Sequence, residues 1–196
     1  MADHCVPVPL SEKPFIATGC LSCPDKSENC CVGSYVPLTL RDVDAIRELG
    51  YDLAGAVQAS EYFAEYLVDD EDWWRDSVTG VGGRLYRLTT KKREDGACVF
   101  LEEGKGCLLG PRRPVVCKIY PFWVDHRGGI IYEPGEEECC YIASGSYTLE
   151  EGIALIDESP GSIREYFQAI RQDCLENHDR HRELVETALG AAAPEA

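Results

Sequence analysis

Two cysteines, Cys107 and Cys117, lie at the ends of a segment that is rich in proline. Pro111 and Pro114 lie between them, and Tyr120-Pro121-Phe122 follows shortly after Cys117. Because proline fixes its own φ angle and favours extended geometry in the residue before it, we expect a stiff loop. A stiff loop that holds two thiols at a fixed separation is typical of a site for a metal ion or a metal cluster.

A second group of cysteines precedes this loop. Cys20 and Cys23 form a C-x-x-C pair, in which a tight turn can bring both sulfur atoms to one metal ion. The turn-forming segment 24–29 then leads to the adjacent Cys30 and Cys31. Two adjacent cysteines can bind one cluster only with distortion, so one of them could instead serve a second site or pack in the interior.

The chain has 11 cysteines, an odd number that does not fit a complete disulfide framework. Cys5 lies in a proline-rich N-terminal arm and Cys174 falls on the apolar stripe of a helix, so we assign neither to the metal site. The remaining cysteines are Cys20, Cys23, Cys30, Cys31, Cys98, Cys107, Cys117, Cys139 and Cys140. They exceed the needs of one four-thiolate site, so either one multinuclear cluster or two sites would use them. Thiolates bind zinc and iron–sulfur clusters alike, and the residues leave both open.

Composition limits the class of protein. With 196 residues, 44% of them hydrophobic, the chain can bury a core of its own. The sequence has no apolar run of membrane-spanning length, and its N-terminus lacks the pattern of a secretory signal. We therefore expect a cytoplasmic protein with no membrane partner, in a reducing compartment where clustered cysteines more often bind metal than form disulfides. The formal net charge of −16 argues against a nucleic-acid partner, which needs a basic surface.

Hydrophobic periodicity predicts an α+β fold, a small irregular metal-stapled domain with short strands, flanking helices and a long C-terminal helix. Thr39 is expected to cap a helix that ends at Gly50, and residues 53–68 are expected to form a second amphipathic helix. Thr148 begins a capping-box pattern, and the long helix is expected from Ser162 to Leu189. The expected strands are 34–38, 85–88, 98–101, 122–124 and 129–132.

These elements predict four parts of the chain. They are an extended arm (1–19), a cysteine-rich metal-binding domain (20–150), a helical segment packed on it (151–189) and a disordered tail (190–196). Within the last helix, Cys174, His178 and His181 share one face, which could hold a metal but is more commonly an ordinary helix face. The basic residues that gather in 84–93 and at 112–113 form either a solvated surface or a local anion site.

The order of these motifs resembles the YkgJ-like CxxCxxCC family of zinc- or iron-chelating domains, which is similar to the cysteine-rich part of flagellin lysine N-methylases. The resemblance covers about residues 20–150. It rests on the C-x-x-C and double-cysteine pairs, Cys98-Val-Phe-Leu, Cys107, and Arg113-Pro-x-x-Cys117-x-x-Tyr-Pro-Phe122. The closing motif implies that Cys139 rather than Cys140 is a ligand, whereas the gap from Cys23 to Cys30 is longer than usual. The implied ligands are Cys20, Cys23, Cys30, Cys31, Cys98, Cys107, Cys117 and Cys139.

Three functions are compatible with these residues. The first is a protein that holds an iron–sulfur or other polynuclear iron centre, with redox or catalytic activity as options. Arg113 and Tyr120 would then contact the cofactor. The second is a structural zinc-binding interaction module, whose partner is another protein. The third, implied by the resemblance, is a protein lysine methylase-like enzyme whose acidic surface would attract a lysine substrate. The sequence identifies no catalytic residue and does not decide whether the protein is an enzyme.

Overall fold

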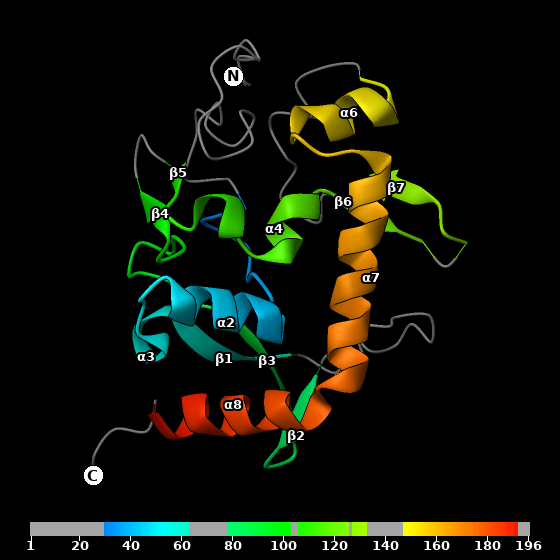
Figure 1. Cartoon of the computed structure of the whole chain (residues 1–196). Helices are drawn as coiled ribbons and strands as arrows, with labels where there is room; N and C mark the ends of the chain where they lie inside the picture. The colour runs from blue at the N-terminus through cyan, green and yellow to red at the C-terminus, as the bar shows by residue number, and fades with distance from the viewer. Residues whose placement is uncertain (1–29, 63–77, 103–105, 126, 133–146, 192–196) are drawn as a thin grey trace. The chain divides into compact units, whose positions relative to one another are not determined.

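The computed structural model describes residues 30–62, 78–102, 106–125, 127–132 and 147–191 (Figure 1). Within these ranges the chain forms helices and small antiparallel sheets, so the predicted α+β class is confirmed. The chain divides into two compact units. Unit 1 comprises Met1–Ser34, Lys92–Arg113 and Cys117–Phe167, and unit 2 comprises Tyr35–Lys91, Pro114–Val116 and Gln168–Ala196.

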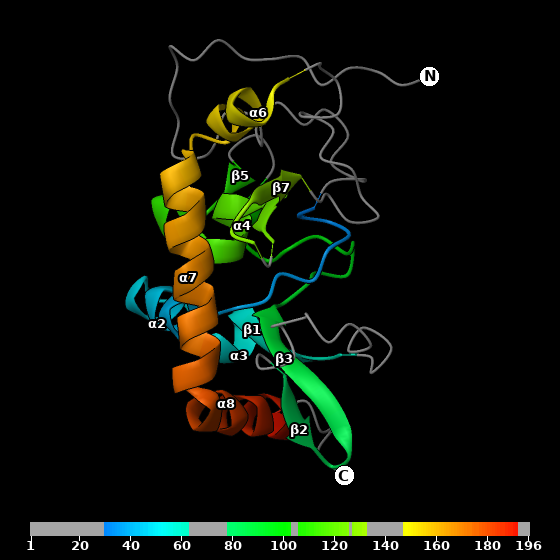
Figure 2. The same ribbon diagram turned by 90° about the vertical axis from the view of Figure 1, so that its right-hand side faces the viewer.

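A three-stranded antiparallel sheet forms the centre of unit 2. Its central strand β3 (Arg84–Thr90) pairs with β1 (Val57–Glu61) on one side and β2 (Thr79–Val81) on the other. Figure 2 shows the long β3 with the shorter β2 beside it. The C-terminal helix α8 (His178–Ala191) contacts all three strands. The buried apolar side chains of this unit include Val43, Ile46, Leu88, Ile170 and Val185.

Helix α2 (Leu40–Glu48) begins and ends where the sequence predicts. Thr39 Oγ1 accepts a hydrogen bond from Asp42 N at 3.1 Å, and Asp42 Oδ2 accepts one from Thr39 N at 2.9 Å. This reciprocal capping box satisfies backbone donors that a helix start otherwise leaves unpaired. Gly50 follows with φ of +85°, the left-handed conformation that favours glycine at helix ends.

The second predicted helix is wrong over most of its described length. Helix α3 (Leu53–Ala56) has only four residues, and strand β1 begins at Val57. Strand β1 pairs with β3 along its whole length, from Val57 opposite Thr90 to Glu61 opposite Tyr86. Pairing with a strand about 30 residues away outweighs a weak local helix preference. Residues 63–68 lie outside the described residues.

The long C-terminal helix is present as α7 (Pro160–Glu176), but the run expected from Ser162 to Leu189 is divided at Asn177. Asn177 Nδ2 donates to Asp173 Oδ1 at 3.3 Å, and the Asn177 carbonyl accepts from His181 N at 3.0 Å. Asparagine is a weak helix former because its side chain offers the backbone alternative hydrogen bonds. Helix α8 therefore starts as a separate element.

Unit 1 contains two short hairpins and a capped helix. Its elements are β4 (Leu101–Glu102) paired with β5 (Gly106–Cys107), β6 (Phe122–Val124) paired with β7 (Ile130–Tyr132), and α6 (Leu149–Leu155). Asp125 Oδ1 closes the second hairpin by accepting hydrogen bonds from Arg127 N and Gly129 N, both at 2.8 Å. The predicted hairpin and the capping box of Thr148 with Glu151 are both confirmed.

Two further findings concern the predicted organisation. In the part of the chain that the structure describes, no helix has the combined length and apolar character to cross a membrane. The N-terminal arm and most of the tail lie outside the described residues, so the predicted domain boundaries stay predictions.

Candidate metal centre

The proline-rich loop folds into two short helical segments. The 3-10 helix η3 (Gly110–Arg112) places Pro111 in its first turn, and α4 (Val115–Ile119) begins directly after Pro114. Proline suits the start of a helix because the N–H that it lacks would have no helical partner there. Gly110 has φ of +55°, which a side chain would disfavour. The local chemistry of this loop therefore fixes where α4 begins, two residues before Cys117.

Four cysteines from separate segments of unit 1 influence one another electrostatically. Burial raises the pKa of Cys107 to about 11, and negative charge on Cys31 and Cys98 adds to this effect. Burial also raises the pKa of Cys117 well above its usual value, with the charges of Cys31, Cys107 and Cys98 as further causes. Folding thus brings half of the eight predicted ligands into mutual electrostatic range.

Backbone pairing explains how two of these cysteines come together. Cys98 N donates to the Cys31 carbonyl at 2.6 Å, and Lys92 forms an antiparallel bridge with Cys98. Lys92 Nζ in turn donates to the Val32 carbonyl at 2.8 Å. The segments around residues 31 and 98 are therefore tied to each other by main-chain and side-chain hydrogen bonds.

Cys31 differs from the other thiols because its thiolate form is favoured. A hydrogen bond from the Cys30 side chain lowers the pKa of Cys31 to about 7, against the opposing effect of burial. The positive charges of Lys92 and Arg113 lower this pKa further. The adjacent cysteines thus act as a donor and an acceptor, and the lowered pKa favours Cys31 over Cys30 as the candidate ligand.

Arg113 is a buried cation beside these thiols. Its side chain belongs to a residue that is only 8% exposed, and its charge lowers the pKa of Cys31, Cys107 and Cys117. The ion pairs found among the described residues do not include Arg113. Arg113 therefore lies where its charge favours the thiolate forms of these cysteines, and its contact with a cofactor stays a prediction.

The other predicted site residues are less well defined. Tyr120 follows α4 directly and is half-buried, and its contact with a cofactor stays a prediction. Cys20, Cys23 and Cys139 lie outside the described residues, as does Cys140. Within the described ranges, no three His, Cys, Asp or Glu side chains are arranged as ligands of one metal ion. That the described thiols are ligands stays a prediction, and their soft sulfur donors would suit zinc or iron.

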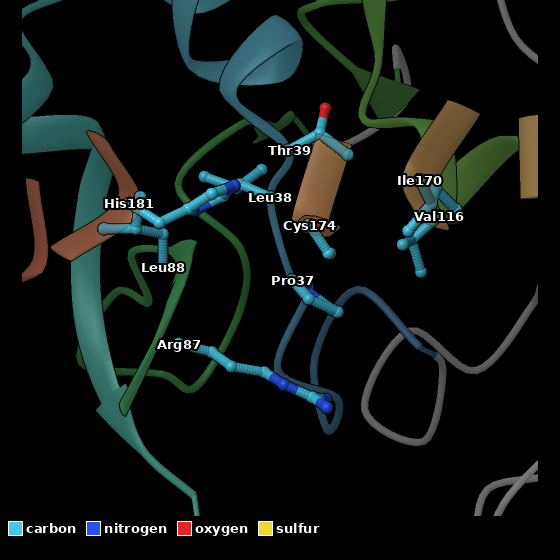
Figure 3. Close-up of a pocket in the computed structure, with 9 residues that line it drawn as sticks. All are labelled: Pro37, Leu38, Thr39, Arg87, Leu88, Val116, Ile170, Cys174 and His181. Atoms are coloured by element: carbon cyan, nitrogen blue, oxygen red, sulfur yellow. The ribbon is translucent and has the colours of Figure 1, made fainter. Parts of the chain in front are cut away.

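The alternative metal face on the C-terminal helices is better explained as ordinary packing. His181 Nε2 lies 2.8 Å from Asp173 Oδ2, which also accepts from Leu40 N at 2.9 Å. Cys174 and His181 are both buried and help to line a small, mainly apolar pocket of unit 2 (Figure 3). A histidine held in this way is a satisfied core residue, and the divided helix no longer offers the single face that the sequence suggested.

The basic residues of segment 84–93 also have internal partners. Lys91, Lys92 and Arg93 each donate to a backbone carbonyl, and Arg93 also pairs with Asp95 at 3.1 Å. Arg84 pairs with Glu61 at 3.2 Å across the sheet. These contacts favour a structural role for the basic segment over an anion site.

Clustered thiols with a buried arginine, in a small α+β fold, define a class of metal-binding, cysteine-rich domains. Within this class, the CxxCxxCC family, whose description reads "Putative zinc- or iron-chelating domain", matches residues 19–174. The chain therefore belongs to this family, and the resemblance in the motifs is confirmed. The match also reaches beyond residue 150, so α6 and most of α7 belong to the family region. Among curated proteins and solved structures, none matches the chain.

Proposed function

We propose that the protein holds an iron–sulfur or other polynuclear iron centre through its clustered cysteines. The observation that carries this proposal is the thiol count. Eight cysteines are predicted ligands, whereas one zinc ion takes only four sulfurs. Four of the eight lie in mutual electrostatic range (Cys31, Cys98, Cys107 and Cys117), and the others are Cys20, Cys23, Cys30 and Cys139. A set of this size suits a cluster better than a single ion.

The charges around the thiols support the same proposal. Metal ligands must be deprotonated, yet burial keeps Cys107 and Cys117 protonated at neutral pH in the absence of a cation. Arg113 and Lys92 offset only part of the negative charge that a full set of thiolates would carry. Cys31 offers a thiolate more readily than Cys107 or Cys117, and of these three we expect it to bind first. A bound iron–sulfur cluster would supply one-electron chemistry, and a reducing cytoplasm would keep the thiols available to it.

Anaerobic reconstitution tests this proposal. Wild-type protein should take up iron and sulfide and show broad absorbance near about 400 nm, as expected of thiolate-bound iron. Cys117→Ala should lose most of the bound iron, since it removes a central ligand. Cys174→Ala is the matched control, because it removes a buried thiol of unit 2, and it should keep the iron. Wild-type protein that takes up no iron and remains colourless would overturn the proposal.

A structural zinc module is the second candidate, and the burial of the thiols favours it. Cys98 is buried and Cys107 and Cys117 are partly buried, which is compatible with a structural zinc site whose coordination is closed. This candidate predicts a colourless protein with bound zinc that unfolds when a chelator removes the metal. Retention of the circular dichroism spectrum after complete chelation would argue against it.

A further inference from the structure

Asp42 is a buried carboxylate that caps two helices. It lies in the first turn of α2 and is only 4% exposed. Its Oδ2 accepts hydrogen bonds from Thr39 N at 2.9 Å and from Thr39 Oγ1 at 2.8 Å. Its Oδ1 accepts a further one from Val115 N at 3.1 Å, although Val115 is 73 residues away in the sequence. Val115 is the first residue of α4, so the same side chain serves the start of both helices.

The bond to Val115 matters because α4 is too short to hold itself in place. A helix of five residues has few backbone hydrogen bonds of its own, and its first N–H groups have no partner within it. External contacts must therefore set its direction. Cys117 lies in the first turn of α4, so the direction of its sulfur follows from the direction of that turn.

The surroundings of Asp42 both oppose and support a charged carboxylate at this position. Burial raises the pKa of Asp42, and the nearby negative charge of Asp173 adds to this, whereas the hydrogen bonds from Thr39 and Val115 lower it. Asp173 is itself occupied by Leu40 N and His181. Among these groups, only Asp42 accepts a hydrogen bond from α4.

We propose that Asp42 is a positioning residue for the metal centre, which fixes the first turn of α4 so that Cys117 can bind metal. The inference rests on the proposed metal-binding role of Cys117. Asp42 itself is no ligand, and it acts through the hydrogen bond to Val115. The capping box of α2 alone, without this second bond, would serve stability only.

Two variants separate positioning from stability. Asp42→Ala removes both caps, whereas Thr39→Ala weakens the α2 cap and leaves the Asp42–Val115 bond in place. Zinc affinity, measured by competition with a chelator, should fall roughly tenfold to a hundredfold in Asp42→Ala, as for other residues that orient metal ligands. In Thr39→Ala it should stay within about twofold while the melting temperature falls. If Asp42→Ala does not fold, Asp42→Asn is measured instead, and its zinc affinity should fall by a smaller factor.

A second readout is independent of metal. In the metal-free protein, alkylation of Cys117, followed by mass spectrometry, should be several times faster in the Asp42 variant than in wild type and unchanged in Thr39→Ala. Faster alkylation of Cys117 in the Asp42 variant, together with no uptake of iron or zinc by the wild type, would support the positioning role and overturn the proposed function. Folded Asp42 variants with wild-type zinc affinity and wild-type Cys117 reactivity would overturn the inference alone.

Discussion

The two units bury polar groups in opposite ways. The polar network of unit 2 consists of two carboxylates with protein partners. Asp42 accepts hydrogen bonds from Thr39 and Val115, and Asp173 accepts one from Leu40 N and lies 2.8 Å from His181 Nε2. In unit 1, the thiols of Cys107 and Cys117 are buried with raised pKa values, and a thiol makes only weak hydrogen bonds. The first arrangement is complete within the protein, whereas the second gains most from a bound cation.

This difference separates two roles of buried polar side chains, one in specifying the fold and one in binding metal. Buried polar groups that find their partners in the protein specify a fold, since any loss leaves a group unsatisfied. Buried thiols with raised pKa values are neutral on their own, and a bound metal ion would stabilise their thiolate forms. The network of unit 2 should therefore be sensitive to side-chain deletion, and the centre of unit 1 should be sensitive to pH and metal.

The largest expected effect is the pH dependence of metal affinity. The raised pKa values keep Cys107 and Cys117 protonated at neutral pH, so metal binding through both, as proposed, would release at least two protons. Raising the pH removes this competition, and zinc affinity should therefore rise about a hundredfold from pH 7 to pH 8. Competition titrations at several pH values measure the slope. A slope of less than one proton per metal would show that the buried thiols are not ligands.

The second largest expected effect is a loss of stability when the polar network of unit 2 is broken. His181→Ala removes the partner that lies 2.8 Å from Asp173 and leaves a cavity beside Cys174, and it should lower the free energy of unfolding by about 2 kcal/mol. His178→Ala is the matched control, because His178 is only half-buried, and should cost less than about 0.5 kcal/mol. Denaturant unfolding measures both values.

Zinc affinity measured in His181→Ala and His178→Ala tests whether unit 2 also affects the thiol centre of unit 1. Both should bind zinc as the wild type does, since neither histidine is a proposed ligand. Loss of zinc binding in His181→Ala alone would mean that His181, and not only Asp42, supports the thiol centre.

Some of this architecture follows from local sequence and some does not. Thr39 and Thr148 carry the spacing of a capping box, which acts within three residues, so both helix starts were predictable. The sequence predicts a helix where strand β1 forms, because the pairing of β1 with β3 has no local signal. The same applies to the bond between Asp42 and Val115, which joins residues far apart in the chain.

The candidate site was partly predictable for a chemical reason. Cysteines at turns in a reducing compartment predict convergence on metal, and four of them do lie in electrostatic range. The spacing did not indicate which of the adjacent Cys30 and Cys31 becomes the thiolate. That depends on the hydrogen bond between them and on the cations nearby, which only the fold brings together.

The smallest expected effect concerns the cation of the thiol centre, and it uses two neighbouring arginines. Arg113→Met replaces a buried charge with an apolar side chain of similar length, whereas Arg112→Met changes an exposed residue. Without Arg113 the thiolate of Cys31 loses a stabilising charge, so the pKa of Cys31 should rise above about 7. Zinc affinity at pH 7 should then fall about tenfold, the equivalent of one pKa unit.

The pKa of Cys31 in this pair of variants is measured from the pH dependence of its alkylation in the metal-free protein. Arg112→Met should match the wild type in both the pKa and the zinc affinity. An equal change in both variants would point to the net charge of the protein rather than to a local cation. An unchanged pKa in a folded Arg113→Met would mean that the arginine supports the loop by packing alone, and unit 1 would then resemble unit 2 more closely than we infer.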